Sequence, residues 1–222
     1  MAFVHLHNHS DFSILDAATR ISEMVKKAVD EHMPALALTD HGYMFGIPNF
    51  DLECRKYNDN AADMVQWRHD IECFQKGFEL KEPAADGLDA LSHDRAHAQW
   101  EADVAIWNQT HDLEAVKANK PELLIQPIFG CEAYFIKDEC IPRGTKQQRF
   151  HLILLAKNET GYVNLIKCMS QAAGHEMMYY KPRVSLDMLR TYHEGIVCLS
   201  ACVQGIIPWN VRNGNFEEAE QW

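Results

Sequence analysis

The chain has 222 residues, of which 47% are hydrophobic, and a formal net charge of −11. This length and composition can bury the core of one large domain or two small ones. No run of 18 apolar residues occurs, which excludes a transmembrane helix, and Ala2-Phe3-Val4 already resembles a strand rather than a signal peptide. Seven cysteines without a C-x-x-C pair favour reduced thiols and a cytoplasmic protein.

The negative charge is unevenly distributed along the chain. Between Asp51 and Glu122 there are 16 acidic and 8 basic residues, a net charge of −8, which leaves −3 for the remainder. No basic patch of the kind that binds duplex DNA through counterion release is evident. On charge alone the chain is a poor nucleic-acid-binding domain, although it can belong to an assembly whose other parts bind DNA.

The first forty residues alternate strand and helix. Residues 2–6 predict a short buried strand, and residues 19–33 predict a helix with Thr19 as its N-cap, which Pro34 ends. The apolar residues of this helix follow the stripe of an amphipathic helix: Ile21, Met24, Val25, Ala28 and Val29. Residues 35–38 are apolar on both faces, as parallel strands tend to be. This order predicts a right-handed βαβ crossover.

The second half of the chain continues the alternation. Further strands are predicted at 124–129, 132–136, 150–156 and 195–200, and helices at 158–173 and from about residue 203 onward. The fold class is therefore α/β, and a barrel-like arrangement is favoured.

Residues 58–122 have a different composition, rich in Asp, Glu, Gln, His and Trp. Helical spacing occurs in 61–80 and 92–118, with a break at 83–87, which predicts an acidic helical insertion in the α/β scaffold. Without these 65 residues, 157 of the 222 remain, fewer than the roughly 250 of a complete barrel. The last residues, 215–222, still have a helical pattern, so we expect the chain to be a fragment of a longer protein.

The N-terminus holds three alternating histidines, His5-Leu6-His7-Asn8-His9. Alternate residues of a strand point to the same face, so His7 and His9 offer two neighbouring imidazoles, as one edge of a metal site requires. A solvated histidine pair at a strand end is the simpler alternative. Other metal-binding side chains beside apolar runs favour the metal site.

These side chains mostly follow predicted strands, where α/β barrels carry their active sites. Asp16 follows the first strand, Asp40-His41-Gly42 the second, and Cys202 the last. Glu132 follows an apolar run, whereas His151 precedes one, where this geometry does not predict a ligand. Seven candidates exceed the needs of one tetrahedral zinc and imply two or three divalent ions, which suit phosphoester hydrolysis.

Several motifs, in order over about 1–57 and 121–222, resemble the N-terminal polymerase-and-histidinol-phosphatase (PHP) domain of bacterial DNA polymerase III alpha subunits. They are Phe3-Val4-His5-Leu6-His7-Asn8-His9-Ser10, Leu15-Asp16, Ala37-Leu38-Thr39-Asp40-His41-Gly42, Gly130-Cys131-Glu132-Ala133-Tyr134, the segment Phe150-His151 to Asn158, and Leu199-Ser200-Ala201-Cys202. Asn158 to Leu165 and Tyr180-Lys181-Pro182-Arg183 are similar to this polymerase branch rather than to stand-alone histidinol phosphatases.

The resemblance implies a distorted (β/α)7 PHP barrel over 1–57 and 123–222, truncated at its C-terminus, with the insertion at 58–122. It also implies a trinuclear centre of Zn, Mn or Fe, with Mg as another option. Of the ligands that follow, the resemblance implies that the first four take part in catalysis. The implied ligands are His7, His9, Asp16, His41, Glu132, His151 and Cys202. The family's last motif, Asp-x-His, would lie beyond Trp222, so we expect the isolated chain to be inactive.

Three functions remain open at this stage. The resemblance implies a replicative DNA polymerase whose PHP region is a metal-dependent 3′→5′ exonuclease, with DNA, the sliding clamp and a proofreading subunit among its partners, and no membrane. A non-catalytic docking module of the polymerase is the second, and a stand-alone small-molecule phosphatase is the third. Loss of primer trimming in His9→Ala or Asp16→Asn would distinguish the first.

Other polar and aromatic residues have simpler interpretations. His93 and His97 have a spacing superficially like that of a zinc-protease helix, but a solvated helix face is favoured. The tryptophans of the insertion, Trp67, Trp100 and Trp107, are more typical of its core than of a base-stacking surface. His5 and Asp40 are candidates for orienting a ligand imidazole or for a purely structural role.

Overall fold

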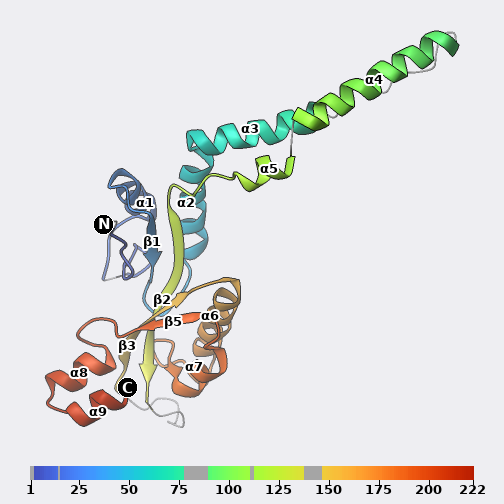
Figure 1. The fold of residues 1–222 in the computed structure, drawn as a ribbon. Coiled ribbons are helices and arrows are strands. Elements are labelled where there is room, and N and C mark those ends of the chain that lie inside the picture. The colour runs from blue at the N-terminus through green and yellow to red at the C-terminus, as the bar shows by residue number, and fades with distance from the viewer. Residues whose placement is uncertain (1–2, 15, 78–89, 111–112, 138–146) are drawn as a thin grey trace. The chain divides into compact units, whose positions relative to one another are not determined.

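The structure, a computed structural model, describes residues 3–14, 16–77, 90–110, 113–137 and 147–222 (Figure 1). The chain divides into two compact units, one made of Met1–Tyr57 with Leu124–Trp222 and the other of Asn58–Leu123. In the described ranges, no helix is both long enough and apolar enough to cross a membrane.

The first unit is built on a mixed, five-stranded sheet. The strands are Ala35–Leu38 (β1), Gln126–Ile136 (β2), Phe150–Ala156 (β3), Val184–Ser185 (β4) and Ile196–Leu199 (β5). They run in the order β1-β2-β3-β5, and β4 pairs with β2 off this path. The sheet is open, so the described residues do not form the closed (β/α)7 barrel.

Strand β2 exchanges partners halfway along its length. Residues 126–129 pair in parallel with β1, whereas residues 130–135 pair antiparallel with β3. The sequence predicted two strands, at 124–129 and 132–136, and this prediction is wrong because Gly130 and Cys131 continue the strand between them. One long strand therefore joins the two halves of the first unit, as the extended yellow-green arrow in Figure 1 shows.

The N-terminal segment differs from the prediction in two respects. Among the described residues of the predicted strand 2–6, only His5 forms a bridge, in parallel with Leu36 of β1. The helix α1, Ile21–Asp30, buries Ile21, Val25 and Ala28 as its stripe predicts. Its N-cap is Arg20 rather than Thr19, and no side chain caps it. The segment thus lies along β1 without becoming a regular strand.

The other helices of the first unit cover the sheet in groups, and an apolar core lies in each half. They are Ile47–Asn60 (α2), Glu159–Ala172 (α6), Leu186–Tyr192 (α7), Ile206–Arg212 (α8) and Phe216–Gln221 (α9). α1 and α2 pack on β1 around Phe50 and Leu38, whereas α6 and α7 pack on β2 and β3 around Leu154 and Leu165. Figure 1 shows α6 and α7 on one flank of β3, with α8 and α9 on the other.

The second unit is helical, with α3 (Ala62–Gly77), α4 (Ala90–Thr110) and α5 (Leu113–Ala118). The indole of Trp67 donates a hydrogen bond to the carbonyl of Val116, 2.8 Å away, and Lys120 lies over its ring. Trp67 therefore joins α3 to α5 within this unit, and its indole N–H is already used. The predicted break at 83–87 lies outside the described residues.

Candidate metal centre

A single carboxylate, Glu132 of β2, lies at the centre of a group of imidazoles. Its side chain is 1% exposed. Oε2 lies 3.2 Å from Nε2 of His7, 3.0 Å from Nε2 of His9 and 3.1 Å from Nδ1 of His41. Oε1 lies 2.6 Å from Nδ1 of His151. Four histidines thus approach the two oxygens of one buried carboxylate.

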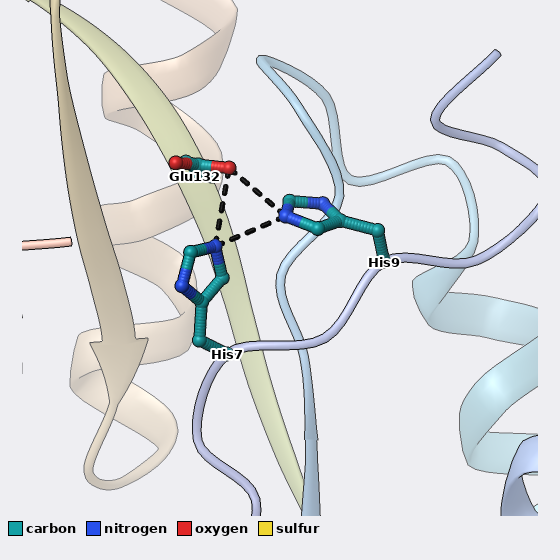
Figure 2. A group of neighbouring side chains, drawn as sticks. All are labelled: His7, His9 and Glu132. Carbon is teal, nitrogen blue, oxygen red and sulfur yellow. Dashed lines mark hydrogen bonds and ion pairs between the residues drawn. The ribbon is translucent and has the colours of Figure 1, made fainter. Parts of the chain in front are cut away.

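Three of these side chains form a triangle (Figure 2). Nε2 of His7 and Nε2 of His9 are 3.0 Å apart, and both face the same oxygen of Glu132. In a tetrahedral zinc site with bonds of about 2.0–2.1 Å, ligand atoms lie roughly 3.3 Å apart. The observed separations of 3.0–3.2 Å are close to this spacing, so a small outward shift would admit one ion.

The backbone brings His41 to Glu132 by extending the pairing of β1 with β2. The N–H of Gly42 donates to the carbonyl of Glu132 at 2.9 Å, and the N–H of Glu132 donates to the carbonyl of Asp40 at 3.1 Å. Gly42 has φ +69°, and a Cβ there would lie 2.9 Å from the ring of Tyr134. A glycine is needed because the turn is left-handed and tightly packed.

His151 reaches the centre because β3 runs antiparallel to β2. It pairs with Tyr134, while Glu132 pairs with Ile153. Residues at i and i+2 share a face of a strand, so His151, Tyr134 and Glu132 point to the same side. The sequence-based objection to His151 assumed parallel strands. It is wrong for this position, because the start of β3 lies at the same end of the sheet as the carboxyl end of β2.

Asp16 and Cys202 lie at the periphery. Oδ2 of Asp16 is 2.8 Å from Nε2 of His41 and 4.0 Å from Nε2 of His9, and its side chain is 56% exposed. Sγ of Cys202 is 3.7 Å from Nδ1 of His151. The described donors that converge form three groups: His7, His9 and Glu132; His9, Asp16 and His41; and His41, Glu132 and His151. Cys202 approaches only the last of these.

Asp40 orders the loop that carries the ligand candidates. It is buried and accepts hydrogen bonds from the backbone N–H and hydroxyl of Ser10, both at 2.7 Å, and from the hydroxyl of Ser13 at 2.6 Å. The oxygen of Ser13 in turn accepts the N–H of His41 and lies 3.4 Å from Nδ1 of His9. Among the described residues, Asp40 therefore supports the histidines through Ser13, and it holds the loop through Ser10, rather than by bonding an imidazole itself.

The electrostatics of the centre favour an ionised Glu132. Burial alone would raise the pKa of this carboxyl, but the close contacts of His151, His7 and His9 outweigh it and hold the pKa well below its usual range. Burial also lowers the pKa of His41. For His9 burial acts in the same direction, but the carboxylates of Glu132, Asp16 and Asp40 outweigh it and raise the pKa.

Several buried atoms at the centre meet the imidazoles or the carboxylate as ion pairs, in contacts that lack the geometry of a hydrogen bond. Among the described side chains these include both oxygens of Glu132 and Nδ1 of His41. Buried polar atoms are rarely left unsatisfied, because each costs about 1–3 kcal/mol. Imidazole nitrogens and carboxylate oxygens are the ligands that zinc, manganese and iron share. The residues therefore fit divalent ions, both because of their chemical type and because their buried oxygens and nitrogens have unused hydrogen-bonding capacity.

The structure brings together six of the seven candidates, with Cys202 at the edge of the group. His93 and His97 belong to none of the groups of donors among the described residues. The residues that sequence reasoning missed are Ser10, Ser13 and Tyr134, whose ring centroid lies 5.8 Å from that of His41 and 5.4 Å from that of His151. The position of Tyr134, two residues after Glu132 on the same strand, was the available signal.

Comparisons with known proteins agree on one family. A family model described as the PHP domain matches residues 5–92 and 93–222. The DNA polymerase III subunit alpha of Treponema pallidum is 32% identical over 224 residues, covering 100% of this chain and 13% of the relative. That of Borreliella burgdorferi is 31% identical over 221 residues (98% and 13%), and that of Aquifex aeolicus 29% over 228 residues (99% and 14%). The chain thus spans about an eighth of these relatives.

Proposed function

The chain belongs to the PHP domain family, and we propose that it is the phosphoesterase region of a bacterial replicative DNA polymerase, acting as a metal-dependent 3′→5′ exonuclease on primer ends. The names of the relatives support the polymerase assignment. DNA and the other replicase subunits, including the sliding clamp, are the partners that follow from it. A PHP barrel over 1–57 and 123–222, carrying an insertion at 58–122, is the corresponding fold.

The observation that carries the proposal is the arrangement around Glu132. A buried carboxylate surrounded by four imidazoles is costly to maintain even when it is paired, because its charge is removed from water, which argues against a purely structural role. Its two oxygens face different histidines, with Oε1 near His151 and Oε2 near His7 and His9. Glu132 would therefore offer one oxygen to each of two groups of histidines, as a ligand shared within a multinuclear phosphoesterase centre would.

Each side chain would then have a distinct task. Divalent cations held here would supply Lewis acids that polarise a phosphodiester and lower the pKa of the attacking water. His7 and His9 would hold one ion with Glu132, and His41 and His151 would hold another, with Cys202 at its edge. His9, Asp16 and His41 would hold the third ion, on the side where Asp16 is exposed to solvent and could meet a strand end.

The test is primer trimming by the protein encoded by the full reading frame that contains this chain. With Mn²⁺ or Zn²⁺ we expect shortening of a 5′-labelled primer from its 3′ end. His9→Ala and Asp16→Asn should abolish this shortening but leave primer extension unchanged, because extension uses other parts of the protein. Variants that trim as fast as the unmodified protein would refute the assignment.

The alternative functions give different results in the same experiments. A docking module would show no trimming, while the ligand substitutions would lower the melting temperature. A stand-alone phosphatase would hydrolyse phosphomonoesters instead. Reading the gene past the codon for Trp222 separates these cases further. A long frame with an Asp-x-His motif and paired polymerase aspartates supports the replicase, and a stop soon after such a motif supports the phosphatase.

A further inference from the structure

Two cations lie over the aromatic ring that borders the metal centre. Cζ of Arg149 is 5.8 Å and Nζ of Lys181 is 5.5 Å from the ring centroid of Tyr134. The same ring stacks on His41 and meets His151 edge-on. Tyr134 therefore links two positive charges to two of the candidate ligands. Among the described residues, neither cation forms an ion pair with a carboxylate, although the chain as a whole is acidic.

A tight turn holds Lys181 in this position. Tyr179 and Lys181 form an antiparallel bridge, in which the N–H of Tyr179 donates to the carbonyl of Lys181 at 3.2 Å. Arg149 donates from its guanidinium to the carbonyl of Tyr179 at 3.0 Å, which is the one hydrogen bond its side chain makes to the described residues. The next residue, Pro182, packs against Gly42 beside the ring of Tyr134. The turn is thus fixed against the loop that carries His41.

Arg183 anchors the base of the turn. It is 2% exposed, and its guanidinium donates to the carbonyls of Met177 and Glu176, at 2.6 and 3.3 Å, and to Oε1 of Gln147 at 3.2 Å. A buried arginine that donates to neutral acceptors is expensive to keep, because its charge is removed from water. Here it joins the segment before Arg149 to the turn before Lys181, and so fixes the spacing of the partly buried Arg149 and the exposed Lys181.

Tyr180, at the tip of the turn, is displayed to solvent in a strained conformation. It has φ +58°, which is unfavourable for a bulky residue, and its side chain is 83% exposed. Its ring meets that of Tyr179 edge-on, with centroids 4.7 Å apart. Strain of this kind persists where the surroundings enforce it, and such positions cluster at ligand sites. An exposed aromatic ring next in sequence to Lys181, on the turn whose Tyr179 carbonyl accepts a hydrogen bond from Arg149, is a surface on which a nucleic-acid base can stack.

We propose that Arg149, Tyr180 and Lys181, here called the Tyr134 rim, bind the single-stranded 3′ end of DNA beside the metal centre. Arg149 and Lys181 contact successive phosphates, and Tyr180 stacks on an unpaired base. The proposal rests on the proposed function, since it names the residues that present a phosphodiester to that centre. Two cations can neutralise a few phosphates of a single strand. They are too few to form the basic patch that binding of duplex DNA requires.

The first test is binding of a short 5′-fluorescein oligothymidylate with a phosphorothioate 3′ linkage, which resists hydrolysis, to the metal-loaded chain. We expect Arg149→Gln and Lys181→Gln each to weaken binding about tenfold and to reduce the slope of log K against log salt by about 0.7 for each phosphate that is no longer neutralised. Tyr180→Gly should weaken binding by a similar factor with the slope unchanged, because stacking is uncharged. Glycine tolerates the positive φ, so this variant retains the turn.

Lys167→Gln, on the exposed face of α6, is the matched control for the change in charge. It should bind as the unmodified chain does. Arg149→Lys and Lys181→Arg should restore most of the binding, which separates loss of charge from misfolding, and metal content checks that the centre is intact. Equal weakening by Lys167→Gln, or unchanged binding by the two rim variants, would overturn the proposal.

Two further results separate the rim from the proposed function. If the protein trims DNA but the rim variants bind and trim normally, the rim proposal fails and the nuclease stands. If the rim variants lose binding but no form of the protein trims, the rim stands and the nuclease fails. Photocrosslinking with a 5-bromodeoxyuridine oligonucleotide should label the peptide containing residues 179–181. Labelling elsewhere, or equal affinity for a free phosphomonoester, would contradict a single-strand site.

Discussion

Oε1 of Glu132 lies 2.6 Å from Nδ1 of His151, on the neighbouring antiparallel strand, while Oε2 faces His7 and His9 from the N-terminal segment. One carboxylate thus contacts ligand candidates from both halves of the first unit. The consequences of this relationship can be measured directly.

Glu132→Gln should remove bound metal. The amide keeps the shape of the side chain but loses the charge that two ions would share, so we expect metal content after dialysis to fall at least tenfold, measured by elemental mass spectrometry. Glu194→Gln, an exposed residue, is the matched control and should retain full metal content. Equal metal content in Glu132→Gln and the unmodified chain would show that Glu132 is not a ligand.

In the metal-free chain, the contacts of Glu132 and His9 should stabilise the fold most between about pH 4.5 and 6.5, the ordinary pKa values of a glutamate carboxyl and an imidazole. The pKa of Glu132 is lowered, so its contribution is present above the first value and is lost as pH falls below it. The pKa of His9 is raised, so its contribution is complete below the second value and is lost as pH rises through the folded pKa. Urea unfolding with chelator at pH 4, 5.5 and 8, compared with Glu132→Gln, measures the difference.

Added metal should stabilise the folded chain most at alkaline pH, where the ion contacts of the metal-free chain are lost. Ligand imidazoles must be neutral, so binding strengthens as pH rises and stabilises the folded chain where the ion pairs no longer do. The melting temperature with and without Zn²⁺ should therefore differ more at pH 8 than at pH 5.5. A larger metal-induced shift at pH 5.5 would contradict histidine ligation.

Asp40→Asn should destabilise the loop that carries the histidines. It replaces a buried charged acceptor of three hydrogen bonds, at a cost of about 1.5–3 kcal/mol in the free energy of unfolding. Ser13→Ala removes one of these bonds and should cost about 1 kcal/mol. Ser22→Ala, on the exposed face of α1, is the control and should change little. Urea denaturation of the metal-free chain measures all three, and unchanged stability in Asp40→Asn would refute the network.

Cys202 should be the thiol that metal protects from alkylation. It is partly exposed and lies 3.7 Å from His151, so Zn²⁺ that binds both residues would block its reaction with iodoacetamide. Burial raises the pKa of Cys54 and Cys168 to about 12, so these thiols should react only after unfolding. Exposed Cys198 should react at the same rate with and without metal. Peptide mapping by mass spectrometry measures each site, and labelling of Cys202 that ignores Zn²⁺ would exclude it as a ligand.

Local pattern was enough to predict the elements whose signals are strong. The apolar stripe located α1, the unbroken apolar run located β3, and Asn158 marks the start of α6 by accepting the N–H of Gly161. The relative direction of paired strands could not be predicted, because the hydrophobic periodicity is the same for parallel and antiparallel strands. His151 was doubted for that reason alone. Short elements such as β4 and α7 were missed because two to seven residues give too little periodicity.

The candidate ligands were named from their residue types and from the resemblance, but their supporting side chains were not. Ser13 and Asp40 are common residue types whose importance depends on burial, which a single sequence does not show. Tyr134 resembled any core aromatic. The rim residues Arg149 and Lys181 are far apart in sequence, and only the pairing of β2 with β3 and the turn at 179–181 brings them to the same ring.

The exchange of partners along β2 has a thermodynamic consequence. The strand is shared by two apolar cores, one around β1 and one around β3, and the exchange occurs between residues 129 and 130, just before Glu132. His7, His9 and His41 belong to the half around β1, and His151 belongs to the half around β3. Ions coordinated by both sets of residues would cross-link the two cores. Neither core could then melt without dismantling the site, so metal occupancy would convert two separable melting events into one cooperative transition.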